Sequence, residues 1–175
     1  MLEGNDPSQV SAPPKKSWGL LKIAGLLIIG IVVVVLFIQN KKVNDYNGYV
    51  DEIKKISSIE ESIIDKYDSV IGTNYKDDST MYKKIQEMLP ETRDFIYKLE
   101  SIRPKEKELI AIHEVYISGW NNQLGAFLLM ASAIETQDTA KVVEANDRIT
   151  KGRALLRDYV NAMESYRDRI STFGF

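Results

Sequence analysis

The sequence predicts an all-α protein, in which a single N-terminal transmembrane helix precedes an antiparallel bundle of about four helices. Three observations lead to this prediction. Residues 18–38 form one long apolar run, and apolar side chains after residue 43 recur at steps of three and four, the period of one helix face. No segment shows strand-like alternation or a hairpin turn. Short breaks divide residues 43–175 into helix-length segments, as in an antiparallel bundle.

The apolar run from Trp18 to Ile38 has the length of a membrane span. No charged or polar side chain occurs from Ile23 to Ile38. About 21 helical residues extend roughly 31 Å, which matches the hydrocarbon core of a bilayer. Lys22 lies close enough to the amino end for its side chain to reach the headgroups. We expect the lipid bilayer to be the partner of this segment.

A buried core helix and a cleaved signal peptide are the two alternatives to a membrane anchor for this run. A buried helix of a soluble core rarely runs this far without a polar position. A cleaved signal peptide would use Lys15 and Lys16 as its charged region, but a small-x-small cleavage site is missing, because Gln39–Lys42 follows. We therefore expect an uncleaved signal-anchor.

The anchor divides the chain into three parts. Residues 1–17 are predicted to be a disordered polar tail, because they contain little apolar bulk, and residues 43–175 to be one extracytoplasmic helical bundle. A charged segment followed by an apolar run is the usual signal-anchor arrangement. We expect a single-pass protein of the cell membrane, with the N terminus cytoplasmic and the C-terminal domain outside.

Composition excludes several functions. From Val43 onward there are 18 Lys and Arg against 23 Asp and Glu, a net charge of about −5. Nucleic acid is therefore not an expected partner, because phosphate binding needs a concentrated positive face. The chain has no cysteine, which excludes disulfides, thiolate metal sites, cysteine catalysis and lipoprotein anchoring.

The first helix after the anchor has a near-heptad apolar seam between Tyr46 and Val70, which only Glu60 interrupts. The seam residues are Tyr46, Tyr49, Ile53, Ile56, Ile63, Tyr67 and Val70. Two arrangements fit this pattern: the core face of a bundle, or a parallel coiled coil with a second copy. We favour the bundle, because the seam is under four heptads long and the other helices need a partner.

The second helix is expected between Asp77 and Ile102. Gly72–Asn74 ends the preceding helix, and Asp77–Thr80 supplies N-cap residues. Pro90 lies in the middle of the apolar pattern. We therefore expect a kink or a break at Pro90.

The third helix should be the central one, because residues 109–134 are the most apolar part of the domain. Pro104 is expected to open this helix. Gly119 and Gly125 beside Trp120 should let a neighbouring helix approach closely. Asp138 and Thr139 then cap the last helix, which carries apolar residues as far as Ile170.

The catalytic and metal-binding patterns in the sequence are incomplete. His113-Glu114 begins like the zinc-protease helix motif, but Ile117 stands where the second histidine is needed. We expect His113 to be a buried or semi-buried ring that forms a hydrogen bond within the bundle. No carboxylate pair is flanked by residues expected to bury it and raise its pKa.

No Glu-x-x-His pair, phosphate-binding glycine loop, Ser-His-Asp set or calcium loop is present. We therefore predict no catalytic, cofactor-binding or metal-ligating residue, no cofactor and no enzymatic activity. The nine tyrosines and Trp120 are expected to pack in the core, with a ligand pocket as the alternative. Phe173-Gly174-Phe175 either packs or meets a partner.

Asp45-Tyr46-Asn47-Gly48-Tyr49-Val50, directly after an N-terminal anchor, resembles LemA-type membrane proteins. Those proteins have an anchor, a Tyr-Asn pair and then a helical bundle. The resemblance covers only these few residues, and the arginine-rich continuation of that family is missing. It implies the same layout of anchor and bundle, and membership in the family is not inferred.

The function expected from this layout is that of a protein-interaction or accessory subunit at the cell envelope, with another membrane or envelope protein, or a second copy, as the partner. The alternative is a small-molecule-sensing bundle that signals through a membrane partner. Such a sensor would need a partner, because only about 17 residues precede the anchor. An enzyme would need a hidden carboxylate site near His113 and Trp120.

Overall fold

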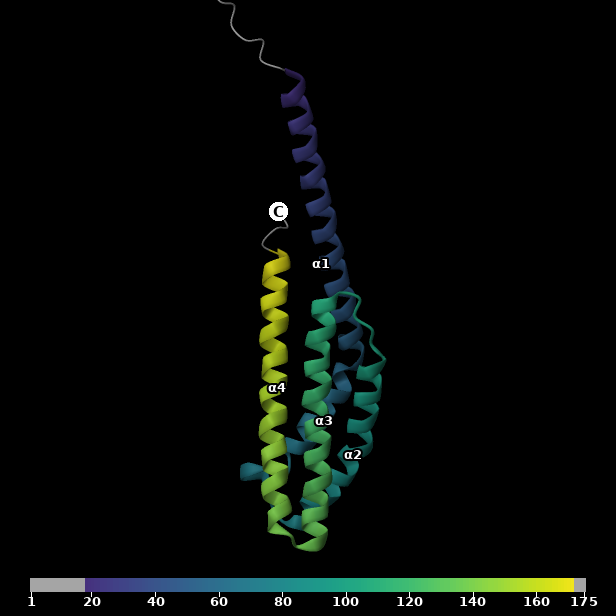
Figure 1. The fold of residues 1–175 in the computed structure, drawn as a ribbon. Coiled ribbons are helices and arrows are strands. Elements are labelled where there is room, and N and C mark those ends of the chain that lie inside the picture. The colour runs from purple at the N-terminus through teal and green to yellow at the C-terminus, as the bar shows by residue number, and fades with distance from the viewer. Residues whose placement is uncertain (1–17, 172–175) are drawn as a thin grey trace, which may run out of the picture. The chain divides into compact units, whose positions relative to one another are not determined.

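The computed structural model describes the backbone of residues 18–171 and the side chains of residues 37–171. No strand occurs in this range, so the predicted all-α class is confirmed. The elements, in chain order, are α1 (Trp18–Asp68), the 3-10 turn η1 (Gly72–Asn74), α2 (Asp78–Ser101), α3 (Lys107–Thr136) and α4 (Thr139–Ser171) (Figure 1).

The predicted transmembrane anchor, residues 18–38, lies almost entirely outside the described side chains. The chain forms two compact units that divide between Ile38 and Gln39. Within residues 37–171, no helical segment is both long and apolar enough to cross a membrane. The predicted disordered tail, residues 1–17, and the terminal Phe173–Phe175 are likewise outside the described residues.

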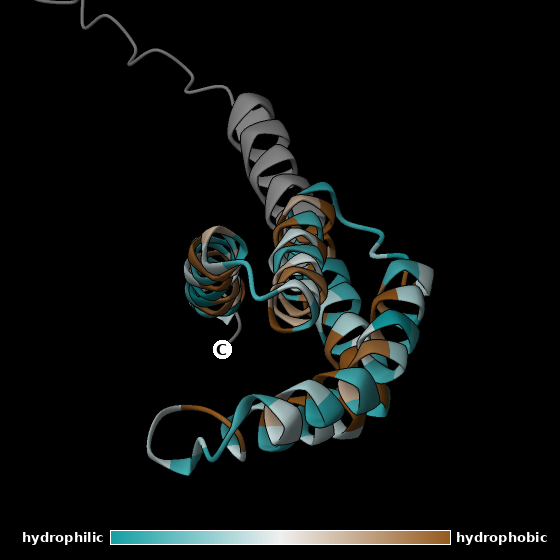
Figure 2. Cartoon of the chain, turned by 90° about the horizontal axis from the view of Figure 1, so that it is seen from below, coloured by the Kyte–Doolittle hydropathy of each residue, from teal (hydrophilic) through white to brown (hydrophobic). Residues whose placement is uncertain are grey.

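The seam of α1 packs inside the chain, as the bundle interpretation predicts. Tyr49, Ile56, Ile63 and Val70 are buried. Ile56 and Ile63 join apolar residues of α2, α3 and α4 in one core cluster, and Tyr49 joins residues of α3 and α4 in a second. Figure 2 shows hydrophobic and hydrophilic residues on the same helices, which is the pattern of amphipathic helices around a shared core.

α2 begins as predicted, but Pro90 does not break it. The Asp77 carboxylate accepts a hydrogen bond from the Thr80 backbone N–H at 2.7 Å, which satisfies one of the free N–H groups of the first turn. The helix then runs from Asp78 through Pro90 to Ser101. Pro90 is exposed, so the Gln86 carbonyl that loses its partner can bind water. The predicted break is therefore wrong, whereas the alternative of a kink at Pro90 stays a prediction.

α3 begins later than predicted. Pro104 lies in an extended linker, and the helix starts at Lys107 with Glu106 as its N-cap. The Glu106 carboxylate accepts hydrogen bonds from the backbone N–H groups of Glu108 (2.6 Å) and Leu109 (3.2 Å). A carboxylate at this position satisfies free N–H groups and favours the positive end of the helix dipole. This cap, rather than the proline, sets the start of α3.

α3 is the central helix, as predicted, and lies between α2 and α4 (Figure 1). The backbones of α3 and α4 approach each other closely at glycine residues. A Cβ added at Gly119 would lie 2.7 Å from the Leu156 side chain, and one at Gly125 would lie 2.8 Å from Arg148. Gly152 of α4 was not singled out in the sequence. A Cβ added there would lie 3.0 Å from the Gly119 carbonyl oxygen.

α4 has the predicted cap. The Asp138 carboxylate accepts hydrogen bonds from the backbone N–H groups of Ala140 (3.0 Å) and Lys141 (3.4 Å). The preceding residue, Gln137, has a positive φ of 54°. This left-handed residue ends α3, and its N–H and that of Asp138 both bond to the Ala133 carbonyl.

Candidate functional site

His113 lies in the interior of the bundle, where the sequence predicted it. The ring is 4% exposed, and its Nδ1 shares a hydrogen bond of 3.1 Å with the Tyr49 hydroxyl of α1. Because the Tyr49 hydroxyl donates its one proton to Tyr159, the Nδ1–H tautomer of His113 is the donor in this bond. Burial lowers the pKa of His113, and the Leu99 carbonyl partly opposes this effect. The ring is therefore neutral at pH 7 and acts as a hydrogen-bonding group.

The hydrogen bonds continue from Tyr49 into a stack of tyrosines. The Tyr49 hydroxyl donates to the Tyr159 hydroxyl of α4 at 3.4 Å. The Tyr159 ring stacks on the Tyr116 ring of α3, with centroids 4.1 Å apart and planes 4° from parallel. Burial raises the pKa of all three hydroxyls, so each remains protonated at neutral pH.

Glu60 of α1 is the last member of this series of hydrogen-bonded and stacked side chains. Its carboxylate accepts hydrogen bonds from the Tyr116 hydroxyl (2.7 Å) and from Trp120 Nε1 (3.2 Å) of α3. Burial raises the pKa of Glu60, while the two donors act in the opposite direction. The sequence predicted no carboxylate to be buried with a raised pKa, yet Glu60 is half-buried and its pKa is raised, because its seam position turns it toward α3.

These six residues form what we call the buried polar network: Tyr49, Glu60, His113, Tyr116, Trp120 and Tyr159. Three helices contribute to it, and the geometry of each bond depends on how those helices are placed. A shift of α1 or α4 against α3 would break at least one of these contacts. The network therefore specifies one packing of the bundle and would respond to a change in that packing.

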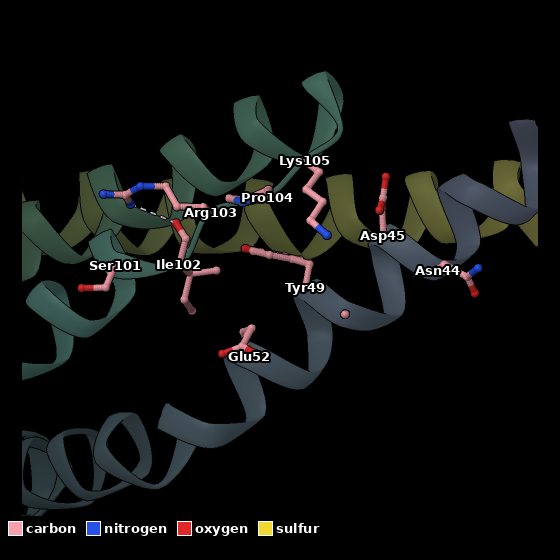
Figure 3. A pocket seen from close by; sticks show the side chains of 10 residues that line it. Asn44, Asp45, Tyr49, Glu52, Ser101, Ile102, Arg103, Pro104 and Lys105 are labelled. Atoms are coloured by element: carbon pink, nitrogen blue, oxygen red, sulfur yellow. Dashed lines mark hydrogen bonds between the residues drawn. The ribbon is translucent and has the colours of Figure 1, made fainter.

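A cavity of about 370 Å³ lies between α1 and the linker from α2 to α3, with Tyr49 in its wall (Figure 3). Asp45 and Glu52 supply negative charge, and Arg103 and Lys105 supply positive charge. The Arg103 guanidinium donates to the backbone carbonyls at the end of α2. Because the charges are mixed and the arginine is already engaged, this cavity selects no one class of ligand.

A second cavity, of about 210 Å³, lies between α1, α3 and α4, and we call it the Trp120 cavity. Its lining residues are Ile63, Ile64, Tyr67, Asp68, Trp120, Gln123, Phe127, Arg153 and Leu156. Most of them are apolar or aromatic, and Trp120 also belongs to the buried polar network. A molecule in this cavity would therefore contact the indole that donates to Glu60.

Two polar side chains of the Trp120 cavity, Gln123 and Arg153, have no hydrogen-bond or ion-pair partner among the described residues. The Gln123 side chain is 6% exposed and makes no hydrogen bond to the described residues. The Arg153 guanidinium lies over the Tyr67 ring, 5.9 Å from its centroid, and has no carboxylate partner among the described residues. Because the Gln123 amide has no partner among the described residues, it is available to a ligand, which makes this cavity the stronger candidate for a binding site.

No group of three His, Asp or Glu side chains within residues 37–171 is placed to hold a metal ion. The predicted absence of catalytic, cofactor-binding and metal-ligating residues remains a prediction. Comparisons with protein-family models, curated protein sequences and solved structures found no match to this chain. By its fold it is an all-α helical bundle with a buried polar network and an adjoining apolar cavity.

Two features of the site were not predicted from the sequence, although a signal for each was present. Glu60 occupies a core position of the α1 seam, where an apolar residue is expected. Gln123 follows Trp120 by three residues, on the apolar face of α3. A polar residue at a core position of an amphipathic helix predicts either a buried hydrogen bond or a binding site.

Proposed function

We propose that this protein is a single-pass membrane protein whose helical bundle acts as a protein-interaction or accessory subunit at the cell envelope. The observation that carries the proposal is the apolar run of residues 18–38, which ends in two exposed apolar side chains. Phe37 is 72% exposed and Ile38 is 48% exposed. Adjacent large apolar side chains in water are unfavourable, and a surrounding bilayer removes that cost.

The proposed orientation places the N terminus in the cytoplasm and the bundle outside. A chain without cysteine allows this to be tested cleanly. We would introduce Glu100→Cys on the exposed surface of α2, or Ser11→Cys in the tail, and label intact cells with a membrane-impermeant maleimide. Labelling of Glu100→Cys alone supports the proposal, whereas labelling of Ser11→Cys alone reverses the orientation.

The interaction role is supported by large apolar side chains that the bundle leaves in solvent. Tyr97 of α2 is 71% exposed, and Val143 and Val160 of α4 are also exposed. Exposed tyrosine is a typical anchor residue of protein interfaces, because its ring contributes contact area at little cost in conformational entropy.

A photo-crosslinking residue placed at Tyr97, Val143 or Val160 tests this role in native membranes. We expect at least one of the three positions to give a single discrete adduct, while Asp147, an exposed polar position on α4, gives none. The absence of an adduct from all three apolar positions, or equal adducts from Asp147, would refute the interaction role of these side chains.

A second candidate function is small-molecule sensing through a membrane partner. The specific observation in its favour is the Trp120 cavity, with its unpartnered Gln123 amide and its contact with the buried polar network. A ligand there would touch α1, α3 and α4 together. In this role the network would carry a change of helix packing to the partner.

A further inference from the structure

We propose that the Trp120 cavity binds a small apolar molecule with an α-amino acid head group. This inference deepens the second candidate function by naming the ligand class of the same cavity. It rests on three features: the apolar floor, the unpaired amide of Gln123, and two opposite charges that lack ion-pair partners in the described part of the chain.

The floor of the Trp120 cavity favours a ligand with an apolar side chain. Ile63, Trp120 and Phe127 are buried, and the Leu156 side chain completes the wall from α4. The Tyr67 ring lies 5.3 Å from the Phe127 ring, so the wall presents aromatic faces and edges. A space of about 210 Å³ is small, and it suits a side chain the size of leucine or phenylalanine rather than a large ligand.

Two charged side chains of the Trp120 cavity favour a ligand head group that carries both charges. The Arg153 guanidinium can bind a carboxylate, and its only described contact is with the Tyr67 ring. Asp68 lines the same cavity, and its carboxylate forms no ion pair among the described residues. A simple carboxylate would meet repulsion from Asp68 and a simple amine repulsion from Arg153. A zwitterion has a favourable partner for each charge.

Gln123 supplies the observation that is independent of the charges. The residue is 6% exposed, lines the cavity and makes no side-chain hydrogen bond within residues 37–171. Its Nε2 is packed close to Gly152, 3.1 Å from the point where a Cβ would lie. An amide without a partner can donate to the carboxylate of a bound ligand or accept from its ammonium group.

The test is calorimetric titration of the purified full chain in mild detergent with L-leucine and L-phenylalanine. The matched probes are 3-phenylpropanoate, which lacks the amine, and phenethylamine, which lacks the carboxylate. We expect saturable binding of at least one amino acid, and at least tenfold weaker binding of both single-charge probes. No saturable binding of either amino acid, or equal binding of 3-phenylpropanoate, would overturn the proposal.

Variants locate the site. Arg153→Gln and Asp68→Asn should each weaken binding about tenfold or more, whereas Arg157→Gln and Asp65→Asn, exposed residues outside the cavity lining, should leave it unchanged. Ile64→Trp, at the partly exposed rim, should block entry without disturbing the core. Thermal unfolding of each variant verifies the fold. Unchanged affinity in both Arg153→Gln and Asp68→Asn would place the ligand elsewhere.

The result of the amino acid titration is independent of the proposed role as a protein-interaction subunit. A protein that binds no amino acid but gives a crosslinked adduct would lose this inference and keep the accessory role. A protein that binds an amino acid but gives no adduct would keep the cavity assignment and lose the interaction role. The two failures are therefore distinguishable.

Discussion

Two helical glycines should respond to the same substitution with opposite sign. Gly48 of α1 is exposed, and a Cβ added there would meet nothing within 4 Å. Gly152 of α4 is buried, and its added Cβ would lie 3.0 Å from the Gly119 carbonyl oxygen and 3.3 Å from Asn122 Cβ. Gly48→Ala and Gly152→Ala therefore form a matched pair that tests the α3–α4 contact.

The magnitudes follow from two effects. Replacing glycine by alanine inside a helix stabilises it by about 1 kcal/mol, because glycine loses more backbone entropy on folding. Gly48→Ala should therefore raise the free energy of unfolding by about 1 kcal/mol. At Gly152 the closest neighbour is backbone, which can move only if α3 moves with it, and overpacking of this kind costs about 1–3 kcal/mol. The net effect of Gly152→Ala is destabilisation by about 1 kcal/mol.

Thermal unfolding of the full chain in detergent, followed by far-ultraviolet circular dichroism, measures both effects. For a chain of this size, 1 kcal/mol corresponds to about 2–4 °C in Tm. We expect Tm to rise by about that amount in Gly48→Ala and to fall by about that amount in Gly152→Ala. If Gly152→Ala stabilises the protein as much as Gly48→Ala does, the close approach of α3 and α4 is wrong.

Three further substitutions test the core, a helix end and the buried polar network. Phe95→Ala should destabilise the protein by about 3–5 kcal/mol and change the fluorescence of Trp120, since Phe95 is fully buried with its ring centroid 4.9 Å from that of Trp120; unchanged emission would argue against this contact. Gln137→Gly should raise the free energy of unfolding by up to about 1 kcal/mol in urea denaturation, because φ is 54° there, and a lower value would show that the Gln137 bond to the Ile134 carbonyl outweighs the backbone preference. Because the pKa of Glu60 is raised above 4.5 in the folded state, its contribution to stability is present below pH 4.5 and lost as the pH rises through the folded value. The wild-type free energy of unfolding should therefore fall relative to that of Glu60→Gln as the pH rises from about 4 to 7, and a constant difference would mean that folding does not raise the pKa of Glu60.

The fold was predictable where local physics decides it. The helical period, the Asp77 and Asp138 caps and the seam of α1 each depend on a few neighbouring residues, and the structure has all of them. The break at Pro90 and the helix start at Pro104 were wrongly predicted, because the effect of a proline depends on its surroundings. Pro90 faces solvent, so the helix continues past it, and a stronger cap at Glu106 sets the start of α3.

The candidate site was less predictable, because it depends on which faces of distant helices meet. His113 was correctly placed inside the bundle, since a lone histidine on an apolar face is normally buried. Its partner Tyr49 lies 64 residues earlier in the chain. The burial of Glu60 and the space beside Gln123 exist only once α1, α3 and α4 are assembled. The apolar period of the sequence identifies the buried face of each helix, whereas tertiary packing determines which of these faces contact one another.

The central proposal is that the anchored bundle serves a partner in the membrane. The most direct measurement is the mass of the full-length tagged protein purified from native membranes in mild detergent, with every component identified by mass spectrometry. The proposal predicts that the protein stays with the membranes after an alkaline wash and elutes with a second component in a fixed ratio. A solitary monomer, or release by the alkaline wash, would contradict it.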